Sequence, residues 1–167
     1  MSTQENTILN HQEIQHKTRR IAYQIYETYV HEGAVIIAGI SGGGYTLASR
    51  IYAILNEISD LELRLCEVYV DKKHPLNPIT TSIAKEEYAD KPIVLVDDVL
   101  NSGSTLIYGV KHFLEVPLKK FKTAVLVNRN HKKFPIKADF KGISLSTSSK
   151  EHVEVSFSEE GDTAYLI

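Results

Sequence analysis

The first part of the chain carries a helical hydrophobic pattern. Its apolar stripe comprises Ile14, Thr18, Ile21, Ile25 and Tyr29. Asn10 precedes this stripe and Glu13 follows three residues later, which is the spacing of a capping box. The pattern therefore predicts an amphipathic helix that begins after Asn10 and ends near Gly33.

Short apolar runs alternate with helical patterns along the rest of the chain. We expect strands at residues 34–39, 61–70, 93–96 and 123–127, and a strand pair at 153–157 and 163–167. We expect helices at residues 45–55 and 104–114. Residues 71–85 are polar and contain two prolines, which predicts a long loop, and long loops in compact domains are often functional.

This alternation predicts an α/β fold, with a twisted sheet that has a parallel core and is flanked by helices. Ligands of such sheets bind beyond the carboxyl ends of the strands. Here those ends are residues 39–44, 71–73, 97–105 and 128–131, which are polar or rich in glycine. We therefore expect one domain spanning residues 1–167 with one cleft, to which four segments contribute.

Composition narrows the class of protein. The chain has 167 residues, 43% of them hydrophobic, and a net charge of −2, so no global positive field attracts nucleic acid. The single cysteine, Cys66, forms no internal disulfide. The polar N-terminus lacks a signal-peptide pattern, and no apolar run reaches the roughly 20 residues of a membrane span. We expect a cytoplasmic protein.

Residues 94–105 contain two features that could bind a ligand: a pair of carboxylates and a loop of small residues. Asp97 and Asp98 follow a buried apolar run, where carboxylates can accept hydrogen bonds from a vicinal diol or attract a divalent cation. The small-residue loop that follows can hold a phosphate through hydroxyls and the amides that open the next helix; it comprises Asn101, Ser102, Gly103, Ser104 and Thr105. The alternative is a plain strand end with a glycine turn, and spacing alone leaves both open.

These residues resemble the phosphoribosyl-pyrophosphate (PRPP) motif of type I phosphoribosyltransferases. The resemblance implies that Asp97 and Asp98 bind the ribose hydroxyls of PRPP, and that residues 101–105 bind its 5-phosphate. It also implies Mg²⁺ as cofactor, with Asp97 and Asp98 contacting the ion indirectly through ribose hydroxyls and water.

Further segments resemble the PyrR type of this family, whose members are pyrimidine operon attenuators with uracil phosphoribosyltransferase activity. These segments are residues 7–10, 18–22, 126–131, 134–139 and 146–150. The resemblance implies a small hood formed by C-terminal segments, with the hood over the base included in residues 128–150, and recognition of the base by backbone groups near Ile143. It further implies a homo-oligomer, either a dimer or a tetramer.

The chain departs from the family pattern where pyrophosphate would bind. The corresponding loop is Ser41-Gly42-Gly43-Gly44, without the usual basic residue, although its amides could cradle an anion. Arg129 remains as a candidate contact to pyrophosphate, whereas Asn128 replaces the usual aspartate. In the long loop, Lys72 and Lys73 are candidates to replace a missing arginine, but they also fit a solvated loop.

Two functions follow, with a third alternative of a structural domain whose cleft is unused. The leading hypothesis is an enzyme that transfers a phosphoribosyl group from PRPP to a pyrimidine base, with uracil giving UMP. The second is a regulator that binds PRPP or a nucleotide and controls an RNA or protein partner. Binding to RNA would need a clustered basic face. The candidates for such a face are Lys17, Arg19, Arg20, Lys132 and Lys133, but dispersed charges are the commoner explanation for such residues.

Overall fold

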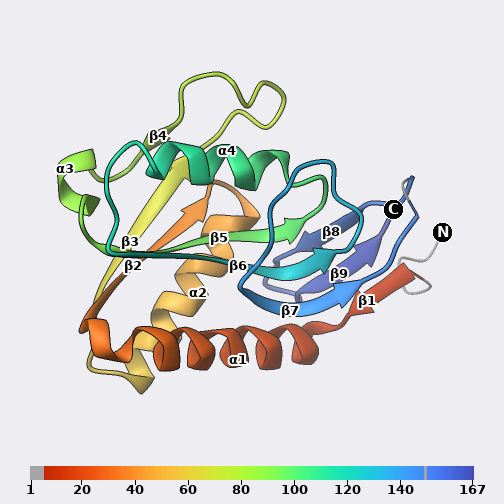
Figure 1. Ribbon diagram of the computed structural model, residues 1–167. Helices are drawn as coiled ribbons and strands as arrows, with labels where there is room; N and C mark the ends of the chain where they lie inside the picture. The colour runs from red at the N-terminus through yellow and green to blue at the C-terminus, as the bar shows by residue number, and fades with distance from the viewer. Residues whose placement is uncertain (1–5, 149) are drawn as a thin grey trace.

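The computed structural model describes residues 6–148 and 150–167 and contains two sheets (Figure 1). The larger sheet has six strands, of which the five longest run parallel. In order across the sheet they are β4 (Thr80–Thr81), β3 (Glu62–Tyr69), β2 (Ala34–Ile40), β5 (Pro92–Leu100), β6 (Lys120–Arg129) and β7 (Phe140–Leu145). The predicted α/β fold with a parallel core is therefore confirmed.

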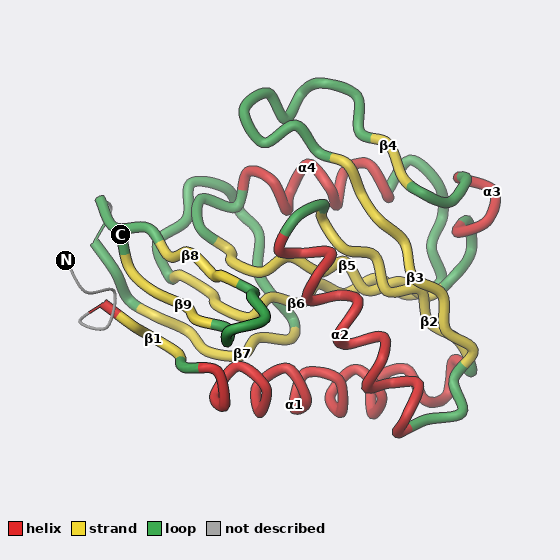
Figure 2. The backbone as a smooth tube through the Cα atoms, turned by 180° about the vertical axis from the view of Figure 1, so that it is seen from behind, coloured by secondary structure: helices red, strands yellow, loops and turns green. Residues whose placement is uncertain are grey.

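Helices cover both faces of this sheet. The long helices α1 (His11–Tyr29) and α2 (Gly43–Ile58) lie on one face, and α4 (Ser104–Phe113) lies on the other (Figures 1 and 2). Within β5, Val94 and Val96 pack in the cluster under α1 and α2, whereas Ile93 and Leu95 pack in the cluster under α4. Successive side chains of a strand point to opposite faces, so a strand covered on both sides reads as a continuous apolar run.

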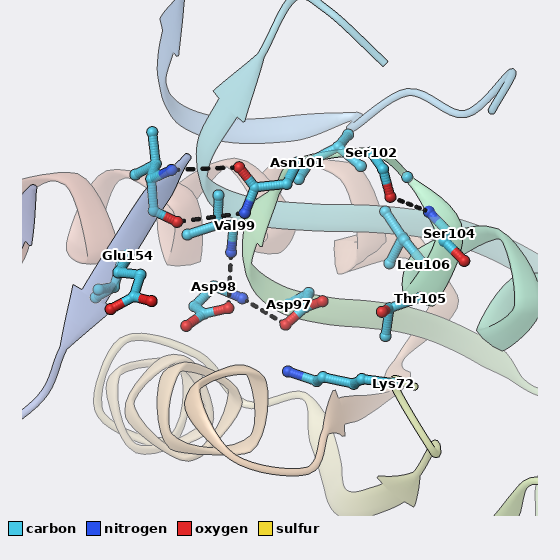
Figure 3. Close-up of a pocket in the computed structure, with 14 residues that line it drawn as sticks. Lys72, Asp97, Asp98, Val99, Asn101, Ser102, Ser104, Thr105, Leu106 and Glu154 are labelled. Carbon is cyan, nitrogen blue, oxygen red and sulfur yellow. Dashed lines mark hydrogen bonds between the residues drawn. The ribbon is translucent and has the colours of Figure 1, made fainter. Parts of the chain in front are cut away.

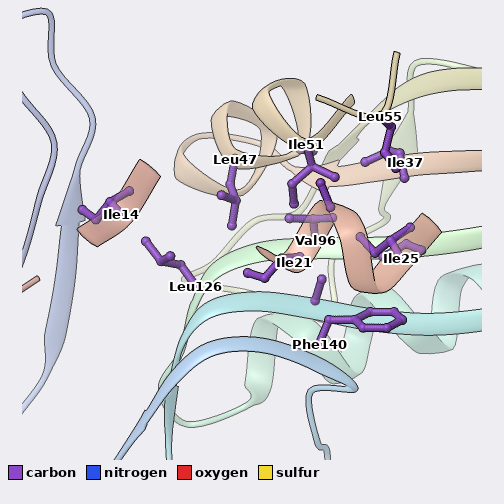
Figure 4. Close-up of a cluster of buried hydrophobic side chains, with 14 of the residues drawn as sticks. Ile14, Ile21, Ile25, Ile37, Leu47, Ile51, Leu55, Val96, Leu126 and Phe140 are labelled. Atoms are coloured by element: carbon purple, nitrogen blue, oxygen red, sulfur yellow. The ribbon is translucent and has the colours of Figure 1, made fainter. Parts of the chain in front are cut away.

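The larger apolar cluster joins α1 and α2 to the sheet (Figure 4). The predicted stripe of α1 is buried throughout, and the capping box at its start is present: the Glu13 amide donates to Asn10 Oδ1 at 2.9 Å, and the Asn10 amide donates to Glu13 Oε1 at 3.0 Å. A 3-10 turn, η2 (Val30–Glu32), leads to Gly33 at φ 74°. The predicted start and end of this helix are confirmed.

The second sheet is antiparallel and lies beyond the carboxyl ends of β5 and β6 (Figure 1). Its strands, in order, are β1 (Thr7–Leu9), β9 (Thr163–Leu166) and β8 (Val153–Ser156). We call this three-stranded sheet the hood. The predicted C-terminal strand pair is confirmed, but the hood also takes its third strand from the N-terminal end of the described chain, which the sequence did not predict.

Several predicted boundaries were wrong. Within the segment 128–150, which was expected to include the hood, residues 140–145 form a main-sheet strand that was not predicted: β7 pairs in parallel with β6, with Ile143 opposite Val127. The strand expected at residues 93–96 continues to Leu100, so Asp97 and Asp98 lie inside β5 rather than after it. The expected loop at residues 71–85 contains β4, and the short helix α3 (Lys85–Tyr88) begins at its end.

Among the described residues, no helix has both the length and the apolar character needed to cross a membrane.

Candidate active site

A cavity of about 330 Å³ opens where the main sheet meets the hood. Its wall is formed by the end of β5, by residues 101–106, by residues 153–155 of β8 and by Lys72 (Figure 3). The cavity thus lies at the carboxyl end of a central parallel strand, where this kind of sheet places its ligands. Two of the four predicted segments, 71–73 and 97–105, contribute residues to its wall.

Asp97 and Asp98 stand side by side in this wall. Asp97 is only 4% exposed, and its Oδ1 accepts a hydrogen bond from the Asp98 amide at 2.9 Å. Asp98 is half-buried, and its Oδ1 accepts from the Val99 amide at 2.8 Å. Each carboxylate therefore binds the amide of the next residue through Oδ1, and Asp98 Oδ2 lies close to Gly43.

The Asp97 carboxyl is held in an unfavourable environment for its charge. Burial raises its pKa well above the ordinary value, and the neighbouring charge of Asp98 raises it further. The ammonium of Lys72 opposes this rise. Buried acids with raised pKa values often mark functional sites, because a protein seldom keeps such a cost without a use for the group.

The glycine loop lies directly behind the two carboxylates. A Cβ atom added to Gly43 would stand 2.1 Å from Asp98 Oδ2, and one added to Gly44 would stand 2.9 Å from Asp97 Oδ1. Gly42 adopts φ 94°, which also favours glycine. Ser41 turns to another partner, since its hydroxyl donates to Glu67 Oε2 at 3.0 Å. No residue of this loop lines the cavity itself, so the loop meets the cavity through the two acids.

Residues 102–105 form a tight turn into α4. Gly103 adopts φ 89°, and a Cβ there would stand 2.5 Å from Ile136 Cγ2. The Ser102 carbonyl accepts the amides of Lys133 and Phe134 at 2.9 and 3.1 Å, which fixes the turn to the neighbouring loop. Residues 102–105 all line the cavity, and within the turn the Ser104 amide donates to Ser102 Oγ at 3.2 Å. A rigid turn of small hydroxyl residues at the start of a helix is suited to a phosphate.

Asn101 has a different environment from the rest of its loop. Its Nδ2 donates to the Val153 carbonyl at 3.2 Å, and its Oδ1 accepts from the Val153 amide at 3.3 Å and from Arg129 at 3.1 Å. Its side chain therefore joins the phosphate-type loop to β8 of the hood.

The structure places the remaining predicted site residues away from the cavity wall, except Lys72. Lys72 extends toward the two acids, whereas Lys73 is exposed and only its amide is fixed, by Asp71 Oδ1 at 3.0 Å (Figure 3). Arg129 is buried beneath the wall. Ile143 is half-buried in β7 and packs against the core.

Asn128 is also buried at the end of β6. Its Nδ2 donates to Ser144 Oγ at 3.1 Å, while its Oδ1 has no hydrogen-bond partner among the described residues. An aspartate here would place a negative charge in this buried position and would still leave one oxygen without a donor, although the Ser144 hydroxyl could turn to donate to the other. The neutral asparagine therefore suits this environment better than the aspartate that the resemblance led us to expect.

The sequence did not identify Glu154 as a site residue. It lies on β8 in the cavity wall, and the Tyr165 hydroxyl holds its Oε2 at 3.0 Å. The alternation of β8 places this acid on one face, but only the position of the hood brings that face to the cavity. Within the described ranges, no group of three or more histidine, cysteine or acidic residues could hold a metal ion by itself.

Comparisons with known proteins agree with this geometry. A family model for the phosphoribosyl transferase domain matches residues 4–160. The protein named Bifunctional protein PyrR from Herpetosiphon aurantiacus is 32% identical, covering 91% of this chain and 89% of its own length. The one from Pediococcus pentosaceus is 29% identical, covering 95% of each.

Two solved structures show the same fold. The hypoxanthine phosphoribosyltransferase of Trypanosoma cruzi matches with a TM-score of 0.78 at 14% identity, over 96% of this chain and 95% of that one. A hypoxanthine-guanine phosphoribosyltransferase of Bacillus anthracis matches with a TM-score of 0.71 at 18% identity, over 97% and 98%. Together with the family match and the relatives, these findings establish that the chain belongs to the phosphoribosyltransferase family and is a type I, PyrR-type member.

Proposed function

We propose that this protein transfers the phosphoribosyl group of PRPP to a pyrimidine base, with uracil giving UMP and pyrophosphate. The observation that carries the proposal is the placement of buried Asp97 beside Asp98, in one cavity with the turn that opens α4. A ribose 5-phosphate presents a diol at one end and a dianion at the other. The two acids suit the diol, and the amides and hydroxyls of the turn suit the dianion.

In this proposal the turn of Ser102, Gly103, Ser104 and Thr105 holds the 5-phosphate. Asp97 and Asp98 accept hydrogen bonds from the ribose hydroxyls and face the charge that develops on the sugar as the bond to pyrophosphate breaks. A ring nitrogen of the base attacks the anomeric carbon while the electron pair of the carbon–oxygen bond leaves with pyrophosphate, and the proton of that nitrogen passes to solvent. Catalysis then comes from positioning and from electrostatic stabilisation, without a covalent nucleophile.

The leaving pyrophosphate is assigned to the side of the cavity near Lys72 and the glycine loop of residues 41–44. Lys72 is the one basic residue among those that line the cavity within the described chain. Lys73, one residue along the same loop, would contribute only after a movement of that loop. Because the local protein charge is mostly negative, a cation brought with the substrate fits this donor set. Mg²⁺ would neutralise the pyrophosphate oxygens, while Asp97 and Asp98 face it through ribose hydroxyls and water.

The base is assigned to backbone groups near Ile143, as the resemblance to the PyrR type implies. Such recognition would leave little trace in side chains, so the choice of uracil rests on the named relatives rather than on the cavity wall. Cytoplasmic location and assembly into a dimer or tetramer are part of the same proposal.

Turnover is the direct test of this function. Incubation of the protein with uracil and Mg-PRPP is expected to yield UMP and pyrophosphate, measured by chromatography, and Asp98→Asn is expected to slow the reaction. Cytosine, hypoxanthine and guanine serve as competing bases. Absence of a nucleotide product with every base would contradict the enzymatic proposal.

Gly43 provides a second test, because the acids depend on the absence of its side chain. In Gly43→Ala the new methyl group would displace the Asp98 carboxylate. We expect UMP to bind about tenfold more weakly, the scale of one lost charge-assisted hydrogen bond. The free energy of unfolding should change by less than about 1 kcal/mol, since a short side chain can move aside. Calorimetric titration and urea unfolding measure the two effects, and unchanged UMP affinity would exclude Asp98 from the ribose site.

The alternative function is a regulator that binds PRPP or a nucleotide and acts on an RNA or protein partner. The scarcity of positive charge in the cavity favours it, because pyrophosphate would be held weakly. This function predicts stabilisation by UMP without turnover. A shift assay with pyrimidine leader RNA at several salt concentrations would separate the two, since RNA affinity falls steeply with salt.

A further inference from the structure

Arg129 is buried at the carboxyl end of β6, with only 3% of its surface exposed. All three of its side-chain nitrogens donate hydrogen bonds within the protein. Nε donates to Thr147 Oγ1 at 2.8 Å, Nη1 to Asn101 Oδ1 at 3.1 Å, and Nη2 to the Ser148 carbonyl at 2.9 Å. A guanidinium bonded in three directions is poorly placed to contact pyrophosphate, which is the role expected from the sequence.

The partners of Arg129 belong to two parts of the molecule. Asn101 belongs to the loop that opens α4, while residues 147–148 lead from β7 toward the hood. Asn101 in turn bonds both backbone groups of Val153, so its amide acts like a further peptide unit beside β8. Arg129 and Asn101 together join the phosphate-type loop, the end of β6 and the hood strand that forms part of the cavity wall.

The charge of Arg129 is not matched by an acid. Within residues 6–148 and 150–167, no carboxylate lies within 4.0 Å of its guanidinium, and its three partners are neutral oxygens. Glu151 senses the charge only weakly: its pKa is lowered first by hydrogen bonds from Ser148 and least by Arg129. A buried cation without an acid partner is costly, and an anion bound near Asn101 would offset that cost.

We propose that Arg129 is a positioning residue for the 5-phosphate subsite and not a pyrophosphate contact. It holds Asn101 and the hood in the arrangement that closes the cavity wall, and its unmatched charge favours a dianion in the adjacent turn. The inference rests on the proposed function only in naming the ligand as a ribose 5-phosphate. It assigns Asn101 to the same network rather than to direct contact with phosphate.

Binding of UMP tests this assignment, because UMP carries the 5-phosphate and no pyrophosphate. Arg129→Gln and Asn101→Ala are each expected to weaken UMP binding about tenfold by calorimetry. The double variant should be less than about twofold weaker than either single variant, because both changes break one network. Arg64→Gln removes an exposed arginine of β3 that pairs with Glu87, and should leave UMP affinity unchanged. UMP affinity within twofold of wild type in Arg129→Gln, with weakened Mg-pyrophosphate binding, would overturn the proposal.

Arg129→Lys separates geometry from charge. Lysine keeps the positive charge but offers a single nitrogen in place of the three-way fork. We expect it to recover only part of the UMP affinity lost in Arg129→Gln. Full recovery would show that charge alone matters and would refute the positioning role.

Hydrogen exchange tests the network without any ligand. In folded Arg129→Gln, the amides of residues 153–156 should exchange faster than in wild type, while those of β2 and β3 should keep their rates. Unchanged exchange in β8 would overturn the proposal even if the wild type bound no UMP. Failure of the proposed function would appear differently, as no product and no nucleotide binding in the wild type with the faster exchange still present in the variant.

Discussion

Replacing Asp162 by alanine is expected to lower the free energy of unfolding by about 3–5 kcal/mol, because it leaves a partly buried arginine without its acid. The Asp162 side chain is 1% exposed. It lies in the hairpin that joins β8 to β9 and contacts residues of α1 and α2. Its carboxylate accepts hydrogen bonds from Arg50, from Gln15 Nε2 at 2.6 Å and from the Ser158 amide at 3.3 Å. Arg50 also packs over Phe157, 4.6 Å from the ring centre. Urea unfolding measures the loss, and Glu159→Ala, an exposed acid of the same hairpin, is the matched control.

The loss should depend on pH in a defined direction. Burial alone would raise the pKa of Asp162, but the hydrogen bonds and charge of Arg50 outweigh burial and lower it. A lowered folded-state pKa means that the carboxylate stabilises the protein above the unfolded-state value of about 3.9, and less as the pH falls through the folded-state value. The gap between wild type and Asp162→Ala should therefore stay constant from pH 7 to about 5 and narrow below about 4. A gap that widens in acid would contradict this account.

The parallel core could be predicted because its pattern is local. Ile93 and Val94 belong to one apolar run, and their side chains are buried on opposite faces of the sheet, so helices must pack on both faces. The helices that pack on these faces alternate with the strands along the chain, so the pattern predicts them too. The capping box at Asn10 likewise depends on residues three apart, so the start of α1 was predicted correctly.

Three of the edge strands, β1, β4 and β7, could not be predicted in the same way, whereas the edge strand β8 was predicted. β1 has only three residues and pairs with β9, more than 150 residues away, so no nearby pattern signals it. β7 contains Gly142, which normally weakens a strand. In the fold this glycine is required, since a Cβ there would stand 2.5 Å from the Leu126 carbonyl oxygen. A residue that resembles a strand breaker in the sequence therefore permits close approach to β6.

In the candidate site, too, residues that are close in the sequence could be predicted, and contacts between distant segments could not. Asp97, Asp98 and residues 102–105 are consecutive, and their residue types already indicated a diol and a phosphate. The contacts of Arg129 with Asn101 and Thr147 link three separate segments, and Glu154 reaches the cavity only through the hood. Residue type indicated that Arg129 would bind an anion, whereas the tertiary structure gives its nitrogens to protein oxygens. Residue type alone therefore says least about positions whose partners are distant in the sequence.

Asp97→Asn is expected to have opposite effects on ligand binding and on stability. Asparagine keeps an oxygen at Oδ1 for the Asp98 amide but loses the charge that strengthens a bond to a ribose hydroxyl. We expect UMP binding and uracil turnover to fall about ten- to a hundredfold, as for the loss of a charge-assisted hydrogen bond. The same change removes a carboxyl group whose charged form is disfavoured by burial and by Asp98, so the free energy of unfolding at neutral pH should rise.

The pH dependence identifies the cause of that rise. Burial first, and then the charge of Asp98, raise the folded-state pKa of Asp97. The carboxyl therefore ionises more readily in the unfolded chain, and the wild type loses stability as the pH rises above the unfolded-state value of about 3.9. The stability gain of Asp97→Asn should be large at neutral pH and vanish below about pH 4, where both proteins carry a neutral group. Asp98→Asn, at a half-buried position, should weaken UMP binding with a smaller gain. A lower free energy of unfolding for Asp97→Asn at pH 7 would contradict this explanation. A protein that keeps a buried carboxyl group for function should become more stable when that group is replaced by a neutral one.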